Sequence, residues 1–177
     1  MANIVYIATS LDGYIADKNG NLDWLHSIPN PEGNDFGFHD FMNRVDALVM
    51  GRNTFETVCA FDCEWPYSKP VFVISNSLKT IPEGYQDKAF LVSGELNNIL
   101  ADLNAKGFNE LYIDGGITIQ NFLAQDLIDE MIITTFPIVL GGGSSLFGDL
   151  PSPLAFELKS SETLLNAMVK SHYLRQR

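Results

Sequence analysis

Short apolar runs recur along most of the chain, separated by polar or mixed stretches. The runs at 4–8, 47–50, 71–74, 90–92 and 111–113 are nearly continuous in apolar residues, and many of these are β-branched. A strand covered on both faces gives such a run, whereas a strand with one solvent face alternates. The runs therefore predict the strands of a buried, mostly parallel sheet, with 4–8 at its centre.

Helices are expected between these strands. The capping residues, glycines and apolar spacings predict four of them: Asn34 or Asp35 to about Asn43, a segment that starts at Gly51, Ser93-Gly94 to Lys106, and Gly115-Gly116 to about Gln125. A strand at 131–136 follows, and then two strand-like segments around Phe156 and Val169. Strands and helices alternate first and strands predominate later, so we expect an α/β fold with antiparallel strands at the C-terminal end.

The segment from Ser10 to Gly33 does not fit either pattern. Asp12-Gly13 and Asn19-Gly20 are turn signals inside it, and it is too long to serve only as a connection. Long irregular loops often cover a site, and this is the role we expect here.

Composition limits the class of protein. With 177 residues, 46% of them hydrophobic, the chain suits one domain over residues 1–177. Its formal net charge of −11 disfavours nucleic acid and anionic membrane surfaces as partners. Cys59 and Cys63 have no second pair to complete a metal site, so we expect free thiols and no metal. Free thiols and the lack of a basic leader or a membrane-length apolar run predict a cytoplasmic protein.

Two segments, 48–54 and 112–118, share one predicted arrangement: a buried strand is followed by glycine and then by a helix. The exposed amides and the positive dipole end of a helix N-terminus can hold a phosphate, and glycine lets the ligand approach. Two such turns, with Arg52 beside the first, would suit a diphosphate. Alternatively, Gly51 and Gly115 only permit tight turns.

Several segments of the sequence resemble those of a known enzyme family. Met50-Gly51-Arg52-Asn53-Thr54-Phe55-Glu56 resembles the M-G-R-x-T-[WFY]-E segment of dihydrofolate reductases, and three more segments follow in the same order: Ala8–Ala16 with Trp24, Lys69–Ser77, and Ile113–Leu123. Residues 10–16, 127–130, 137–143 and 146–147 are more similar to the reductase domain of bifunctional riboflavin-biosynthesis proteins and its stand-alone bacterial relatives. The resemblance implies a dihydrofolate reductase-like three-layer α/β/α fold, with a mixed, mostly parallel central sheet and antiparallel C-terminal strands.

The resemblance also implies a site for NADPH. The expected cofactor contacts are Ala8, Ile15 and Ala16 at the nicotinamide, Gly51, Arg52, Asn53 and Thr54 at the phosphates, Ser75 and Asn76 near the adenosine, and Gly115, Gly116, Ile117, Thr118 and Ile119 along the diphosphate. Arg52 suits a ribose 2′-phosphate, and no acid near Ser75 would hold a free 2′-hydroxyl, so NADPH is favoured over NADH.

Hydride transfer requires a proton route as well. Asp35 is the leading catalytic candidate, because a count back from Met50 without gaps places it where dihydrofolate reductases carry a buried carboxylate. The alternative is an ordinary helix cap. Trp24, Phe36, Phe38 and His39 are the predicted substrate contacts, with ordinary packing as their alternative.

The predicted function is an NADPH-dependent oxidoreductase that transfers a hydride to a small planar heterocycle. Asp35 favours a pterin, whereas the family resemblance favours a ribosylaminopyrimidine phosphate. Basic residues are scarce and the zinc-deaminase signature is absent from the sequence, which weakens a dedicated riboflavin role. A non-catalytic nucleotide-binding protein that retains the fold is the alternative. The resemblance further implies a homodimer.

Overall fold

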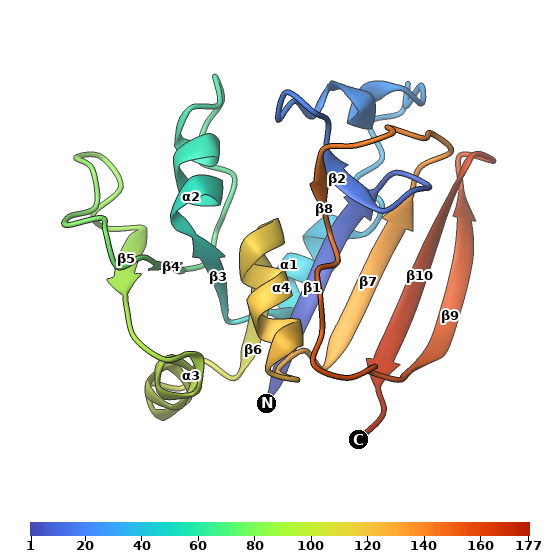
Figure 1. The fold of residues 1–177 in the computed structure, drawn as a ribbon. Helices are drawn as coiled ribbons and strands as arrows, with labels where there is room; N and C mark the ends of the chain where they lie inside the picture. Colours follow the sequence, from blue (N-terminus) through green and yellow to red (C-terminus); the bar gives the residue numbers. More distant parts are fainter.

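An eight-stranded mixed sheet runs through the molecule in the computed structural model, which describes residues 1–177 (Figure 1). Its order is β5-β4-β3-β6-β1-β7-β10-β9. The strands are β1 (Ala2–Thr9), β3 (Ala47–Gly51), β4 (Val71–Ile74), β5 (Ala89–Val92), β6 (Glu110–Asp114), β7 (Glu130–Thr135), β9 (Phe156–Leu164) and β10 (Met168–Arg175). All pairs from β5 to β7 are parallel, and β10 is antiparallel to both neighbours. The predicted α/β class, the interior position of β1 and the antiparallel C-terminal strands are confirmed.

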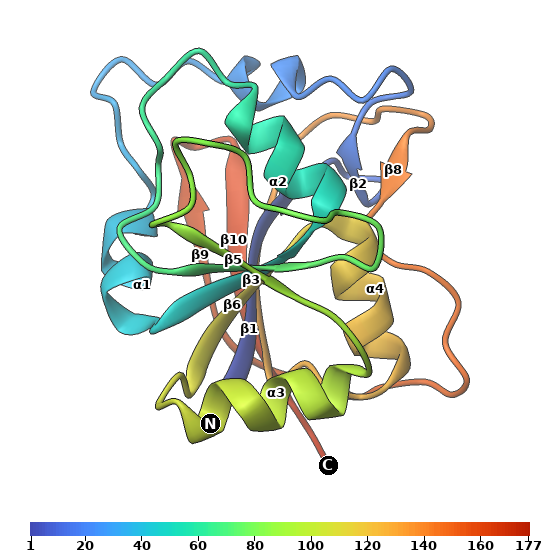
Figure 2. The same cartoon turned by 90° about the vertical axis from the view of Figure 1, so that its left-hand side faces the viewer.

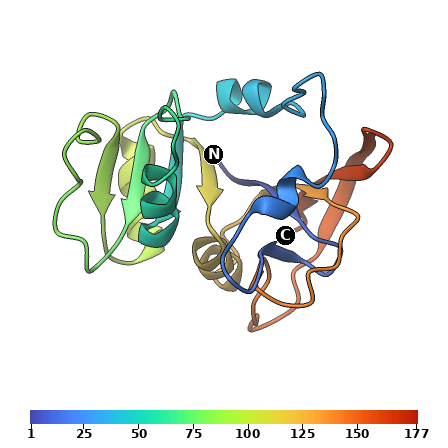
Figure 3. The same ribbon diagram turned by 90° about the horizontal axis from the view of Figure 1, so that it is seen from above.

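Helices cover both faces of this sheet, which gives the three predicted layers (Figures 2 and 3). On one face, α1 (Phe38–Arg44) and α2 (Arg52–Cys59) contribute to the same buried cluster, while α3 (Leu96–Ala105) and α4 (Gly116–Ala124) contribute to the cluster on the other face. None of the helices combines the length and the apolar character that crossing a bilayer requires.

The continuous apolar runs have a direct explanation in these layers. Along β3, Leu48 belongs to the α1–α2 cluster and Val49 to the α3–α4 cluster, and along β6, Tyr112 and Ile113 divide in the same way. Successive strand residues point to opposite faces, so a strand that is covered on both sides needs apolar residues at every position. Complete burial of each such side chain contributes about 1.5–3 kcal/mol to folding.

The first helix starts later than predicted. Its N-cap is Gly37, in a left-handed conformation with φ of 89°, and Phe36 also has a positive φ of 57°. Asp35 lies before the helix and its carboxylate accepts hydrogen bonds from the backbone amides of Gly37 and His39. The residues between Asn34 and Gly37 therefore form a side-chain-stabilised turn, which competes with helix in just such polar sequences.

A small clasp of two short strands was not predicted. In it, β2 (Tyr14–Ala16) pairs antiparallel with β8 (Ser144–Ser145), so the first long loop joins the glycine-rich segment 141–143. Asp12 reinforces the join, because its carboxylate oxygens accept the amides of Leu140 and Gly141 at 3.1 and 2.8 Å. A short 3-10 helix, η1 (Asp23–His26), follows in the same loop.

Candidate functional site

The sheet leaves a crevice between two neighbouring strands whose following helices pack on opposite faces. β3 and β6 are adjacent and parallel, yet α2 follows β3 onto one face and α4 follows β6 onto the other. In open α/β sheets, ligands bind beyond the carboxyl ends of the strands at such a switch point. The topology therefore selects the edge that carries Gly51 and Gly115.

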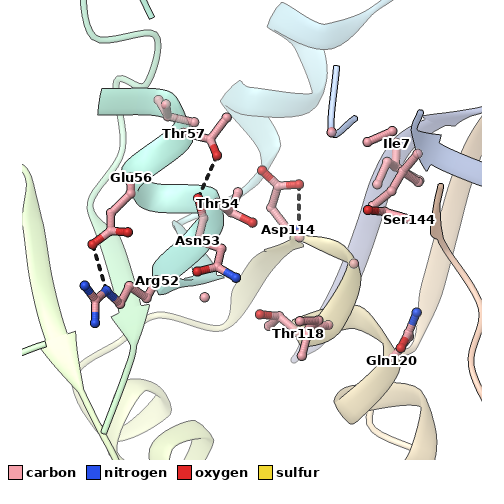
Figure 4. Close-up of a pocket in the computed structure, with 18 of the residues that line it drawn as sticks. Ile7, Arg52, Asn53, Thr54, Glu56, Thr57, Asp114, Thr118, Gln120 and Ser144 are labelled. Carbon is pink, nitrogen blue, oxygen red and sulfur yellow. Dashed lines mark hydrogen bonds and ion pairs between the residues drawn. The ribbon is translucent and has the colours of Figure 1, made fainter. Parts of the chain in front are cut away.

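A pocket of about 990 Å³ occupies this position (Figure 4). It extends from Ile74 at the end of β4 and from Ser77 across both glycine turns to Ile7 and Ala8 of β1. Residues of the β2–β8 clasp, among them Ile15, line its far end. The expectation that the loop from Ser10 to Gly33 lies over a site agrees with this arrangement.

The two glycine turns pack against each other reciprocally. A Cβ atom on Gly51 would lie 2.9 Å from Oγ1 of Thr118 in α4, and a Cβ on Gly115 would overlap Oγ1 of Thr54 in α2. Gly115 also has a φ of 94°, where L side chains are strained. Each helix thus places a threonine into the space left by the other turn's glycine, which holds the two N-termini close together at the pocket.

The N-termini of α2 and α4 are available to bind a ligand. Their N-cap positions are Gly51 and Gly115, and neither helix has a side-chain hydrogen bond that caps it. The first amides of a helix lack partners within the helix, and together with the dipole they attract anions. Asn53, Thr54, Gly116 and other residues of both first turns line the pocket, so the arrangement can hold two adjacent phosphates.

Arg52 lies at one end of the pocket. Its Nε donates to Glu56 Oε1 at 2.7 Å, and Nη1 donates to Ser77 Oγ at 3.1 Å, while Nη2 has no partner within the chain. Figure 4 shows the guanidinium pointing away from Asp114. Ser77 lines the pocket beside Arg52, whereas the predicted contacts Ser75 and Asn76 do not. Ser75 Oγ instead accepts the amides of Ser77 and Leu78 and so shapes the turn after β4.

The remaining predicted cofactor contacts divide into those that line the pocket and one that is buried in the core. The structure brings all but one of them to the pocket wall, namely Ala8, Ile15, Ala16, Gly115, Gly116, Ile117 and Thr118. Ile119 is the exception, because it lies on the buried face of α4 and is completely covered by the core. Close packing is evident at Gly116, where a Cβ would lie 2.8 Å from Cδ1 of Ile15. The predicted cofactor role of Ile119 therefore has no support from its position.

Asp114, at the end of β6, is a carboxylate that the sequence reasoning missed as a candidate. It lines the pocket, and its Oδ1 accepts the amide of Gly115 at 2.8 Å while Oδ2 has no partner. Burial raises its pKa from the ordinary 3.8 to about 6, against the opposing effect of that hydrogen bond. In the view of Figure 4 the carboxyl group lies between α2 and the side formed by Ile7 and Ser144. Asp114 can therefore hold a proton near neutral pH at the pocket wall.

Asp35, in contrast, is exposed and lies outside the pocket. Its hydrogen bonds to the amides of Gly37 and His39 lower its pKa below the ordinary value. Such contacts with backbone amides are typical of a residue at a helix start, although the N-cap position itself is Gly37. The catalytic role of Asp35 stays a prediction that its position does not support.

The four predicted substrate contacts also lie outside the pocket wall. Trp24 is buried against Phe136, with ring centroids 5.2 Å apart. Phe38 packs against Tyr6 and Tyr112, and the carbonyl of Phe36 accepts hydrogen bonds from Tyr6 and Lys170. His39 is exposed. Their observed contacts are those of ordinary packing.

Comparisons of sequence agree with this architecture. The sequence model of the RibD C-terminal domain family matches residues 3–170. The Bacillus subtilis (strain 168) protein YwjB is 38% identical over 176 residues, which cover 97% of each chain. The resemblance to stand-alone relatives of the riboflavin-type reductase domain is thereby confirmed.

Solved structures give the same result. A putative riboflavin biosynthesis protein from Shewanella sp. PV-4 is 66% identical and superposes with a TM-score of 0.99 over both full chains. The Thermotoga maritima diaminohydroxyphosphoribosylaminopyrimidine deaminase/5-amino-6-(5-phosphoribosylamino)uracil reductase is 16% identical with a TM-score of 0.74, and 99% of the present chain covers 56% of it. Enterococcus faecalis dihydrofolate reductase, in a complex with NADP(H), is 16% identical with a TM-score of 0.68, over 99% of this chain and 97% of that one. The last two similarities concern the fold alone.

Proposed function

Because the chain belongs to the RibD C-terminal domain family, which its match over residues 3–170 shows, we propose that it is an NADPH-dependent reductase of a small planar heterocycle. One observation carries the proposal: two uncapped helix N-termini, locked together by Gly51–Thr118 and Gly115–Thr54 packing, meet in one pocket. A dinucleotide diphosphate has the charge and size that such a paired seat accepts.

The residues present fit NADPH along the whole pocket. The helix N-termini would hold the diphosphate, and Arg52 with Ser77 would hold the 2′-phosphate at the end near β4. The apolar groups of Ala8 and Ile15 would pack against the nicotinamide. Bound NADPH supplies a hydride to the substrate.

Asp114 is our proposed proton donor. Its carboxyl group faces the pocket and, with a pKa of about 6, is partly protonated close to neutral pH. A general acid works best when its pKa lies near the operating pH. The hydrogen bond from the Gly115 amide fixes one oxygen and leaves the other free to present a proton to the reduced substrate.

Titration with NADPH and NADH tests the cofactor assignment. We expect NADPH to bind in preference to NADH, and Arg52→Ala to weaken NADPH binding roughly 10- to 100-fold by removing charge-assisted hydrogen bonds. Quenching of tryptophan fluorescence measures both affinities. Arg177→Ala is the matched control, because Arg177 is also an exposed, ion-paired arginine but lies outside the pocket. Failure of the wild type to bind either nucleotide would refute the reductase proposal.

A non-catalytic nucleotide-binding protein remains the second candidate. It shares the cofactor pocket, so NADPH binding alone does not separate the two. Turnover separates them: a binder would show no NADPH oxidation with any pterin, pyrimidine or quinone-like acceptor. The position of Asp114 at the pocket wall, where burial raises its pKa, favours the reductase.

We also propose that the chain forms a homodimer in the cytoplasm. Leu11, Phe147 and Leu150 are exposed apolar side chains at the rim of a second, mainly apolar pocket of about 470 Å³ on β7 and β10. Contiguous apolar surface of this kind is typical of protein interfaces. Sedimentation velocity should show a mass of twice 19.7 kDa, and Phe147→Glu should shift the protein toward monomer. Wild-type protein that is only monomeric at micromolar concentration would count against the dimer.

A further inference from the structure

The wall of the pocket at the expected nicotinamide end is formed in part by the β2–β8 clasp. Ile15 and Ala16 of β2 and Ser144 and Ser145 of β8 all line the pocket. Neither strand belongs to the eight-stranded sheet that carries the two glycine turns. The distance between this wall and the helix N-termini must therefore be fixed by contacts outside the sheet.

Gln120 supplies a directional contact of this kind. It lies in the second turn of α4, is half-buried and lines the pocket. Its Nε2 donates to the carbonyl oxygen of Ser145 at 2.8 Å, and this is the only hydrogen bond that joins α4 to the clasp. In Figure 4, Gln120 lies on the same side of the pocket as Ser144. One side chain thus ties β8 to the helix whose N-terminus faces the pocket.

Both ends of this hydrogen bond are held in place. The backbone at Gly148 packs against the carboxamide, since a Cβ there would lie 3.0 Å from Oε1 and 3.1 Å from Cδ of Gln120. At the other end, Ser145 pairs with Tyr14 of β2, and the following residue, Leu146, is completely buried in the core. The donor and the acceptor therefore have little freedom to separate.

The clasp in turn brings Ile15 onto the first turn of α4. A Cβ on Gly116 would lie 2.8 Å from Cδ1 of Ile15 and 3.6 Å from the carbonyl oxygen of Ser145. Apolar contacts of this kind are non-directional and allow sliding, whereas a hydrogen bond has a preferred length and angle. Gln120 is therefore the contact that can determine where Ile15 lies along α4.

We propose that Gln120 is a positioning residue, which sets the distance between the diphosphate site at the N-terminus of α4 and the nicotinamide wall on the clasp. The inference rests on the proposed reductase function and deepens it. Because Nε2 is engaged by Ser145, Gln120 acts on the cofactor through the clasp. Hydride transfer needs the nicotinamide in one geometry, so this distance matters to the reaction as well as to binding.

The experiment compares NADPH with 2′-phospho-ADP-ribose, which has the same phosphates and no nicotinamide. Calorimetry measures both affinities in the wild type and in Gln120→Met, a side chain of similar length without the donor. The wild type should bind NADPH more tightly than the analogue. Gln120→Met should weaken NADPH binding about fivefold, the effect of one hydrogen bond, and change the affinity for the analogue by less than about twofold.

Gln120→Glu is the second variant, because it keeps the shape of the side chain and replaces the donor by a carboxylate oxygen. Its charge acts on the phosphates of both ligands alike, so the ratio of the two affinities still reports the position of the wall. That ratio should fall about fivefold, as in Gln120→Met.

Gln125→Met is the matched control, because Gln125 is exposed at the C-cap of the same helix and lies outside the pocket. It should leave both affinities unchanged. Equal losses for the two ligands in the Gln120 variants, no loss for either, or equal binding of both ligands by the wild type would each overturn the proposal. Failure of the wild type to bind NADPH and the analogue would instead refute the reductase function on which the proposal rests.

Discussion

Gly115→Ala should reduce NADPH affinity on the order of 100-fold. The new methyl group would overlap Thr54 Oγ1, and the backbone φ of 94° is strained for alanine. The overlap can be relieved only if α2 moves away from α4, which separates the two N-termini. Displacements of about 1 Å at a binding site can cost this much. Fluorescence titration with NADPH measures the change.

Gly107→Ala is the control for backbone strain alone. Gly107 has a φ of 93°, and a Cβ there would have no neighbour within 4 Å. It should lower the free energy of unfolding by about 1 kcal/mol and leave NADPH binding intact. If both variants weakened binding equally, strain and not helix spacing would be responsible. The double change Gly115→Ala with Thr54→Ala removes the overlapped hydroxyl and should be more stable than Gly115→Ala alone.

Asp114→Asn should lower kcat about 10²- to 10⁴-fold with NADPH affinity nearly unchanged, because the amide cannot donate a proton as an acid does. In the wild type, kcat/KM should fall as the pH rises through about 6, where Asp114 loses its proton. That limb of the profile should disappear in the variant. The measurement uses any acceptor that the wild-type protein reduces.

Asp35→Asn decides between the two carboxylates. Because Asp35 bonds only the amides at the start of α1, its replacement should affect stability and spare turnover. If Asp35→Asn abolished turnover and Asp114→Asn did not, the original assignment from the sequence would be right.

Asp114 also affects the stability of the protein in the absence of any substrate. The folded-state pKa of Asp114 is raised from 3.8 to about 6, so the folded protein binds the proton more tightly than the unfolded chain. This contribution is fully present below about pH 4 and is lost as the pH rises through 6. At pH 8, Asp114→Asn should therefore stabilise the protein, by roughly 2 to 3 kcal/mol at most. Chemical denaturation at pH 4 and pH 8 tests the sign.

The sequence predicted the sheet well because burial on both faces leaves a continuous apolar run. β3 and β6 were predicted for this reason, and each leads into a glycine turn whose position at the pocket follows from strand order. β2 and β8 could not be predicted, because strands of three and two residues have no measurable periodicity. Their pairing depends on contacts between segments about 130 residues apart.

The catalytic candidates were harder to predict than the cofactor site. Helix N-termini are defined locally by a strand, a glycine and a helix, so the sequence could single out Gly51 and Gly115, which line the pocket. Their contact with a cofactor stays a prediction. A carboxylate acquires an unusual pKa from burial, which is a property of the whole fold. Asp114 stands directly before two glycines and therefore resembled an ordinary turn residue, whereas the more conspicuous Asp35 forms only local hydrogen bonds.

The clasp between β2 and β8 has a consequence for chain entropy at the pocket. Asp12 bonds the amides of Leu140 and Gly141, and the amide of Leu146 donates to the carbonyl of Gly13. These hydrogen bonds couple two segments that are far apart in the sequence. Ordering the first segment would therefore order the second with it, so the two together would lose chain entropy once instead of twice.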